Sequence, residues 1–248
     1  MKWKYFSSGF NTGKKNMEID LQLARINNAE DVLLRFYRWQ PYCISLGANQ
    51  NIEIIDEMKC SGDNIDIVKR PTGGRAILHA EELTYSVVFP IKLNYTPSVI
   101  YREINYALMK GLEFFDSRLK EAELENLQPD FSSVYKTVEG NACFATAAKS
   151  ELKYSGRKLI GSAQRKLGSV VLQHGSILCG SFHKRITNYL KIDRDEKLKL
   201  LNELNGKTVE IDSILDQAVD YNKLEKSLLK GFEQHFNISV QKESDHKF

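Results

Sequence analysis

One cysteine, Cys143, is followed fifteen positions later by a lysine, Lys158, in an otherwise apolar stretch. A thiol attacks as its thiolate, and a neighbouring ammonium favours that form. This pair therefore allows a reactive thiol if the two side chains meet in space, which spacing alone does not establish. By residue type, a cysteine beside Phe144 is more often a small buried hydrophobe. A lysine in an apolar strand is likewise more often the side chain that faces solvent.

A second segment with chemical potential places two glycines, Gly73 and Gly74, between Arg70 and Arg75, with His79 four residues further on. Paired glycines let the backbone approach a ligand closely and expose N–H groups, and flanking arginines can hold an anion or a carbonyl oxygen. The alternative is a plain turn between two strands with solvated arginines. The segment matches neither the Walker loop nor the GxGxxG pattern.

Two further segments combine small residues with a strand pattern. The residues Gly161–Gln164 follow an apolar run and permit a tight approach to an extended ligand, although Ser162 stands where a Walker loop needs lysine. The step His174-Gly175 lies inside a strand run, where it marks a bulge, a ligand contact or a satisfied core histidine. No GxSxG elbow supports a serine triad.

The elements that must position these residues follow from hydrophobic periodicity and from turn and cap signals. Thr96 before Pro97 is a typical helix start. Asp212 is the predicted N-cap of the last helix. Pro129 argues against one continuous helix across 117–135. Strands lie early and in the middle of the sequence, with helices between them and at the end, which favours an α/β (α+β) class. One domain is expected over 1–248, with about 184–248 as its helical C-terminal part. The predicted strands are 32–39, 43–46, 65–69, 83–89, 152–154, 158–160 and 170–178, and the predicted helices are 14–29, 97–116, 184–204 and 212–236.

Composition excludes several classes of protein. The 248 residues carry 35 Lys and Arg against 32 Asp and Glu, and this net charge of +3 is too small to imply nucleic acid. We expect no membrane span, no export signal and therefore a cytoplasmic protein with reduced cysteines. The sequence contains no CxxC pair, which argues against a structural metal site. A local excess of six basic residues over one acidic residue in 149–166 fits either an acidic partner or a solvated hairpin.

Taken together and in this order, the segments resemble the lipoate-protein ligase A/biotin ligase-like acyltransferases, and within them the LipM-type octanoyltransferases. The resemblance runs from about Asn16 to about Leu178. Its motifs are Phe36-Tyr37-x-Trp39-x-Pro41, Ser45-x-Gly47-x-x-Gln50, Arg70 to His79, Glu82-Leu83-Thr84-Tyr85-Ser86, Ala142-Cys143-Phe144, Gly156 to Gln164 and Gln173-His174-Gly175-Ser176.

This resemblance implies a lipoate/biotin protein ligase-like catalytic domain with mixed β-sheets flanked by helices. In it, Cys143 carries the acyl group as a thioester. Lys158 would lower the pKa of the thiol and bind the acyl carbonyl oxygen. No metal and no cofactor are implied. The residues implied to wall the acyl tunnel and bind substrate are Arg70, Gly73, Gly74, Arg75, His79, Gly161, Ser162, Ala163, Gln164, His174 and Gly175.

The implied reaction moves an octanoyl group from octanoyl-acyl carrier protein to a lysine of a lipoyl-carrier domain, in lipoate biosynthesis. Carrier domains of this kind are the glycine cleavage H protein and the E2 component of 2-oxoacid dehydrogenases. Neither nucleic acid nor a membrane is an expected partner. Residues Ala145–Ser150 depart from the family, which usually has a Pro-Ser-aromatic stretch there, so the shape of the acyl pocket or of the carrier contact is expected to differ.

Three alternatives share the same motifs. An ATP- and Mg-dependent lipoate or octanoate ligase would use Lys158 to hold an acyl-adenylate and leave Cys143 as a packing residue. The position of Cys143 and the Gly-Gly-Arg run, in place of three glycines, favour the transferase. The second alternative is a non-catalytic accessory subunit, which would not need both Cys143 and Lys158. The third is a biotin ligase, but the Gly-Arg-Gly-Arg-type loop of biotin ligases is missing from this sequence.

Overall fold

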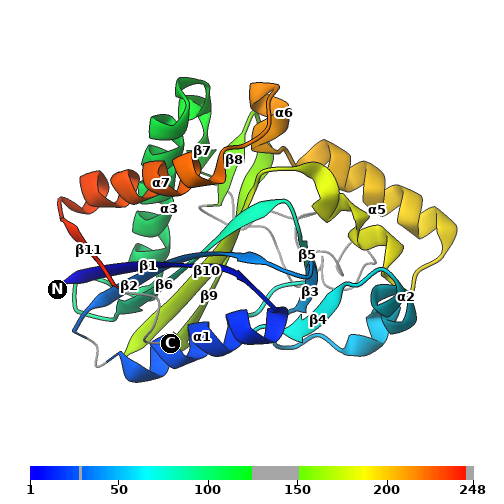
Figure 1. Ribbon diagram of the computed structural model, residues 1–248, viewed down its shortest axis with the longest axis horizontal. Helices are drawn as coiled ribbons and strands as arrows, with labels where there is room; N and C mark the ends of the chain where they lie inside the picture. The colour runs from blue at the N-terminus through cyan, green and yellow to red at the C-terminus, as the bar shows by residue number, and fades with distance from the viewer. Residues whose placement is uncertain (28–29, 125–150, 244–248) are drawn as a thin grey trace.

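The computed structural model describes residues 1–27, 30–124 and 151–243. Its centre is a sheet of eight strands within these ranges, which Figure 1 shows with its flanking helices. The pairs β11–β1 and β1–β2 are parallel and the remaining pairs are antiparallel. The sheet is therefore mixed, and the predicted α/β class with flanking helices is confirmed. Its strands, in spatial order, are β11 (Val240–Lys242), β1 (Trp3–Asn11), β2 (Val32–Trp39), β6 (Glu82–Pro90), β10 (Val170–Leu178), β9 (Arg157–Leu167), β8 (Leu152–Tyr154) and β7 (Glu123–Leu124).

A smaller sheet lies beside the large one. It has the order β4 (Asp66–Lys69), β3 (Cys43–Leu46) and β5 (Ile77–His79). Strand β3 runs parallel to β4 and antiparallel to β5. The glycine-rich segment connects β4 to β5, which are the two edge strands of this small sheet. It therefore crosses from one edge of the sheet to the other.

One face of the large sheet is covered by two packed helices, α3 (Pro97–Phe115) and α7 (Tyr221–Phe236) (Figure 1). The odd-numbered side chains of β6 point into this main core, whose members include Tyr85, Val87 and Phe89. The two helices approach closely because glycines lie at their contact. A Cβ on Gly231 would come within 2.3 Å of the backbone nitrogen of Gly111.

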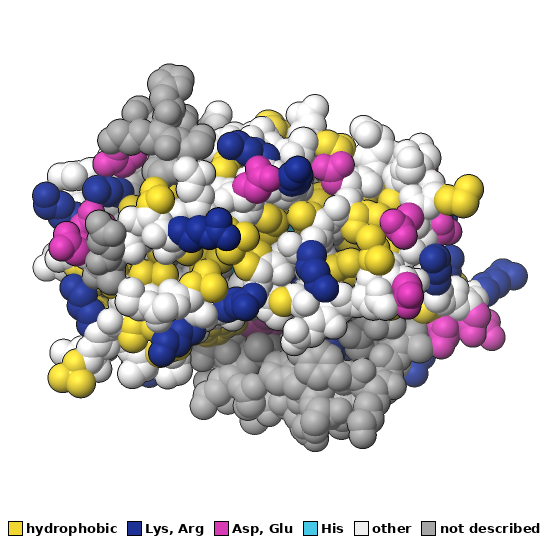
Figure 2. Space-filling model, turned by 90° about the horizontal axis from the view of Figure 1, so that it is seen from below, with side chains coloured by type: hydrophobic (Ala, Val, Ile, Leu, Met, Phe, Trp, Pro, Cys, Tyr) yellow, Lys and Arg dark blue, Asp and Glu magenta, His cyan; other side chains and the backbone are white. Residues whose placement is uncertain are grey.

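The opposite face is covered in part by α1 (Gly13–Ile26), which the side chain of Thr12 caps by accepting a hydrogen bond from the Lys15 amide. In the first half of β6 the even-numbered side chains point to this face and are polar: Glu82, Thr84 and Ser86 are all buried. Further along the strand, Val88 packs in an apolar cluster with α1. Viewed from below, Lys and Arg side chains lie among hydrophobic ones along the middle of the molecule, with most Asp and Glu toward the edges (Figure 2). The polar face of β6 is where the site lies.

Two helix predictions were wrong in their boundaries. Residues 184–204 were expected as one helix but form a 3-10 helix, η5 (Ser181–Asn188), and then α5 (Arg194–Lys207), which starts at a capping box. The expected helix 212–236 is broken into α6 (Ile211–Leu215) and α7. Asp216 ends α6 with φ of 52°, and Asp220, not Asp212, caps α7.

Strands β1 and β11 were not predicted from hydrophobic periodicity. The other short elements are the helix α2 (Glu57–Gly62) and two 3-10 helices, η1 (Ile52–Ile54) and η2 (Ser117–Glu121). The predicted Ser155-Gly156 hairpin is confirmed between β8 and β9, and both turn residues have positive φ, 48° and 73°. Within the described ranges, no helix is both long and apolar enough to cross a bilayer.

Candidate active site

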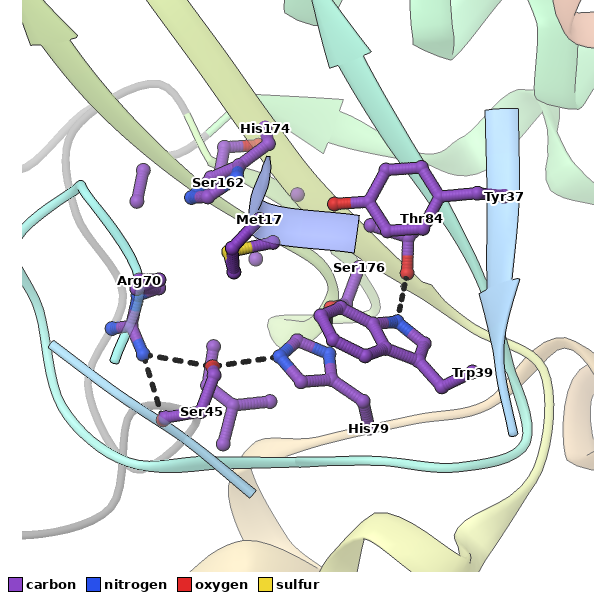
Figure 3. Close-up of a pocket in the computed structure, with 14 residues that line it drawn as sticks. Met17, Tyr37, Trp39, Ser45, Arg70, His79, Thr84, Ser162, His174 and Ser176 are labelled. Carbon is purple, nitrogen blue, oxygen red and sulfur yellow. Dashed lines mark hydrogen bonds between the residues drawn. The ribbon is translucent and has the colours of Figure 1, made fainter. Parts of the chain in front are cut away.

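A pocket opens on the polar face of the large sheet, between α1, the small sheet and strands β9 and β10 (Figure 3). The space between these elements is about 380 Å³, part of it open to solvent. Its wall is made by Met17, Tyr37, Trp39, Ser45, Arg70, Ile77, His79, Thr84, Gly161, Ser162, Ala163, His174, Gly175 and Ser176.

The structure brings most of the predicted substrate-binding residues to this wall and leaves four outside it. The seven in the wall are Arg70, His79, Gly161, Ser162, Ala163, His174 and Gly175. Gly73, Gly74 and Arg75 belong to the loop behind Arg70. Gln164 donates hydrogen bonds to the Pro97 carbonyl (2.9 Å) and to the Gln173 side chain (3.2 Å), so it anchors the start of α3.

Arg70 folds back onto its own loop. Its guanidinium donates to the carbonyl and hydroxyl oxygens of Ser45 (2.9 and 3.1 Å) and to the carbonyls of Gly73 (3.0 Å) and Arg75 (2.7 Å). Both arginines are buried, with exposed fractions of 3% for Arg70 and 4% for Arg75. The alternative of solvated arginines is therefore wrong, and Arg70 shapes the glycine loop from within.

The glycine loop also depends on a close backbone contact with the turn after β3. A Cβ on Gly47 would lie 1.9 Å from the Gly74 carbonyl oxygen, and the Ala48 amide donates to the Thr72 carbonyl at 2.9 Å. Gly74 has φ of 95°, a conformation that residues with a Cβ avoid. Glycine at both positions lets the loop lie directly on β3.

Behind the pocket, a chain of hydroxyl, imidazole and carboxylate groups joins Ser45, His79 and Glu82. The Ser45 hydroxyl lies 2.7 Å from His79 Nε2, and His79 Nδ1 lies 2.8 Å from Glu82 Oε1. The Trp39 ring stacks on the imidazole at 4.1 Å. Burial alone would raise the pKa of Glu82, but His79 and hydroxyl donors, Thr84 among them, outweigh it and hold that pKa below its ordinary value.

A second chain of the same kind joins Thr72, His174 and Asp20. The Thr72 hydroxyl lies 2.6 Å from His174 Nε2, and His174 Nδ1 lies 3.2 Å from Asp20 Oδ2. The buried Arg35 forms an ion pair with Asp20 at 2.7 Å. Burial would raise the pKa of Asp20, but Arg35 and His174 outweigh it, so this pKa is lowered. Burial lowers the pKa of His174, so the imidazole is neutral and donates from Nδ1 to the carboxylate.

The neutral state of His174 predicts a pH-dependent stability. Because the folded-state pKa is below that of the unfolded chain, about 6.5, the unfolded chain binds more protons as pH falls below that value. We expect the free energy of unfolding to decrease from pH 7.5 to pH 5.5, by at most about 1.4 kcal/mol per pH unit for each such histidine. His183, whose pKa burial also lowers, adds to this slope.

Denaturant unfolding at a series of pH values measures this slope. The variant His174→Gln should show a shallower slope than the wild type, because it removes one of the two contributing groups. A free energy of unfolding that rises toward pH 5.5 would contradict the assignment.

Lys158 lies in β9 with an exposed fraction of 2%, so the alternative of a solvent-facing lysine is wrong. Its Nζ lies 2.9 Å from Glu151 Oε2, and the Glu151 side chain is 4% exposed. Cys143 lies outside the described residues, so its predicted pairing with Lys158 stays a prediction. Within the described ranges, no group of three or more His, Cys, Asp or Glu is arranged to hold a metal ion.

The other three cysteines are buried free thiols. Burial raises the pKa of Cys60 to about 11 and holds the pKa values of Cys43 and Cys179 above their ordinary value. At neutral pH all three are therefore protonated, which is the weakly nucleophilic form.

Comparison with known proteins gives the family. The family model described as lipoyl protein ligase A/B catalytic domain matches residues 13–233. The chain belongs to the lipoyl protein ligase A/B catalytic-domain family.

Relatives within the lipoyl protein ligase A/B catalytic-domain family share about a third of this sequence over nearly its whole length. Octanoyltransferase LipM of Clostridioides difficile (strain 630) is 33% identical, over 96% of this chain and 88% of the relative. The protein of the same name from Staphylococcus aureus (strain NCTC 8325 / PS 47) is 32% identical with the same coverage. That from Bacillus subtilis (strain 168) is 31% identical, again with the same coverage.

Solved structures share the fold of this lipoyl protein ligase A/B family member. A lipoate-protein ligase A bound with ATP superposes with a TM-score of 0.77 at 17% identity, covering 100% of this chain and 90% of that one. A bipartite lipoate protein ligase and its E2 lipoyl domain from Thermoplasma acidophilum gives 0.75 at 18% identity, covering 100% and 88%.

Several residues around this family member's pocket were not predicted as site residues. Ser45, Thr72, Asp20 and Glu82 complete the two histidine chains, and Glu151 pairs with Lys158. One signal was available in the sequence: the polar residues of β6 alternate with its apolar ones, which is typical of a strand whose second face lines a polar site.

Proposed function

We propose that this protein is an octanoyltransferase that moves an octanoyl group from octanoyl-acyl carrier protein to a lysine of a lipoyl-carrier domain. The similarity to octanoyltransferases LipM along 96% of the chain supports this activity. The structural observation that carries the proposal is the buried ammonium of Lys158. It lies on the strand whose residues Gly161–Ala163 form part of the pocket wall.

The proposed reaction has two steps that balance without ATP, Mg or another cofactor. In the first, the Cys143 sulfur attacks the carbonyl carbon of the octanoyl thioester. A new C–S bond forms, the bond to the carrier's sulfur breaks, and the carrier leaves as a thiol with the proton from Cys143. One thioester replaces another, so this step is close to isoenergetic.

In the second step, the amine of the acceptor lysine attacks the carbonyl of acyl-Cys143. A C–N bond forms, the C–S bond breaks and the proton lost by the nitrogen returns to the cysteine. An amide is more stable than a thioester, so the step runs downhill. A covalent intermediate lets the two carrier proteins bind one after the other.

The pocket suits the acyl group of this reaction. Its wall includes the small residues Gly161–Ala163 and Gly175, and Tyr37 and Trp39 contribute aromatic surface. Burying the methylenes of an octanoyl chain is worth roughly 5 kcal/mol at ~0.8 kcal/mol for each. In this proposal Lys158 binds the carbonyl oxygen as negative charge develops there.

The proposed acceptor is a lipoyl-carrier domain, such as the glycine cleavage H protein or the E2 component of a 2-oxoacid dehydrogenase. The structural neighbour described with its E2 lipoyl domain supports this class of partner. We place the reaction in the cytoplasm, which the three described free thiols support.

The experiment that tests the proposal is the intact mass of the protein after incubation with octanoyl-acyl carrier protein. We expect a covalent octanoyl adduct that hydroxylamine or excess thiol removes, and a peptide map that assigns it to Cys143. No adduct, together with acceptor modification that requires ATP and free octanoate, would replace the transferase with a ligase. Binding of a lipoyl-carrier domain with no modification under either condition would indicate an accessory subunit.

A further inference from the structure

The ion pair between Lys158 and Glu151 is buried on both sides. The nitrogen-to-oxygen distance is 2.9 Å, and the two side chains are 2% and 4% exposed. Removing an ammonium from water is costly unless a carboxylate compensates it. Glu151 supplies the compensating carboxylate for Lys158.

The same carboxylate also contacts the pocket wall. Its other oxygen, Oε1, accepts a hydrogen bond from the Ser162 amide at 3.4 Å, and Ser162 lines the pocket. One carboxylate thus joins the ammonium to the backbone of the wall. An ammonium has three N–H donors in a tetrahedral arrangement, so fixing one of them toward Glu151 limits the directions of the other two.

A bulge in β9 explains why the lysine takes this direction. Leu152 pairs with Ile160 and Lys153 with Lys158, so Leu159 is an extra residue on β9. Bulges turn neighbouring side chains to new directions and occur often beside active sites. Here Leu159 and Ile160 both enter the main core, which breaks the usual alternation and turns Lys158 away from the direction that regular alternation would give it.

The backbone of Lys158, which pairs with β8, also forms a hydrogen bond with the segment 208–209. Its carbonyl accepts a hydrogen bond from the Val209 amide at 3.0 Å, and it forms an isolated bridge with Thr208. The main chain is therefore fixed by β8 and by the 208–209 segment. Glu151 then determines where the long, flexible side chain ends.

We propose that Glu151 is a positioning residue for octanoyl transfer: it holds the Lys158 side chain in a fixed direction at the Ser162 end of the pocket wall. This inference rests on the proposed function, because it assigns to Lys158 the carbonyl oxygen of the octanoyl group. Glu151 itself contacts neither the acyl group nor the reacting sulfur in this scheme.

The test compares steady-state transfer from octanoyl-acyl carrier protein to a lipoyl domain for a set of variants. Glu151→Gln keeps the size and removes the charge, and should lower kcat by about tenfold or more with KM for the acyl donor within about threefold. Glu151→Asp keeps the charge and should recover part of kcat. The control is Glu113→Gln, which removes an exposed pair of equal length with Lys110 (2.9 Å) and should leave kcat unchanged.

A double variant separates positioning from a general structural effect. If Glu151 acts through Lys158, Glu151→Gln should not slow the Lys158→Ala enzyme further. Additive losses would overturn the proposal, as would a wild-type kcat in Glu151→Gln. If Glu151→Gln fails to fold by circular dichroism, Glu151→Asp decides, since a wild-type kcat there would show that the reach of the carboxylate is immaterial.

These outcomes are distinct from a failure of the proposed function. A wild-type enzyme that transfers no octanoyl group, or a Lys158→Ala enzyme with full activity, would reject the function or the role of Lys158. A Lys158→Ala enzyme that is impaired beside an unimpaired Glu151→Gln enzyme would reject the positioning role alone.

Discussion

Replacing Cys143 with alanine should abolish octanoyl transfer and leave the protein folded. In the proposed reaction the sulfur of Cys143 bears the acyl group between two carriers, so the variant lacks the atom to which the acyl group is bound. The loss should therefore reach the detection limit of an assay that follows the mass of the lipoyl domain. Thermal unfolding of the same sample checks that the variant is folded.

The described thiols provide matched controls for Cys143. Cys60 is buried and its pKa is raised to about 11, so it does not serve as a nucleophile at neutral pH. Cys60→Ala should keep wild-type transfer, at a modest cost in stability. In the native wild-type protein, brief alkylation at neutral pH should modify Cys143 before Cys43, Cys60 or Cys179. Full transfer by Cys143→Ala would reject the thioester mechanism.

Replacing Lys158 with alanine should reduce transfer by about 10²–10³-fold. This is the usual loss when one donor to a developing oxyanion is removed. The ammonium is already buried and ion-paired, so it needs little reorganisation to serve this role. The variant also removes the ammonium that pairs with the buried Glu151 carboxylate, which we expect to cost stability as well.

Two measurements separate the catalytic and structural effects of Lys158→Ala. Single-turnover formation of the acyl-enzyme reports the first chemical step, and denaturant unfolding reports stability. Lys110→Ala, which removes an exposed lysine from α3, is the control for loss of one positive charge. A Lys158→Ala enzyme that acylates at the wild-type rate would contradict the proposed role.

Short-range patterns predicted most of the fold correctly. Strands β2, β3, β6 and β10 have runs of apolar, β-branched or aromatic residues within a few positions of their observed bounds. The break between α6 and α7 was missed because Asp216, not glycine or proline, takes the left-handed conformation. The parallel pair of β1 with the edge strand β11 joins segments almost the full length of the chain apart, and short-range sequence patterns do not indicate such a pairing.

The site was predictable in its parts but not in their connections. The glycine loop, Lys158 and His174 have recognisable neighbours in sequence. The partner of His174, Asp20, is 154 residues away, and only the folded chain brings the two together. The direction of the Lys158 side chain depends on the bulge at Leu159, which interrupts the alternation of a regular strand.

The pairing of the first strand with the last has a consequence for synthesis of the chain. Strand β1 pairs with β2 on one side and with β11 on the other, with Trp3 opposite Val240. The Tyr5 hydroxyl also donates to Glu225 of α7. Until the ribosome has made these late segments, one edge of β1 has no partner in this sheet, and unpaired edges promote association with other chains. A nascent chain paused before α7 should therefore bind chaperones through its N-terminal strand and release them once β11 is made.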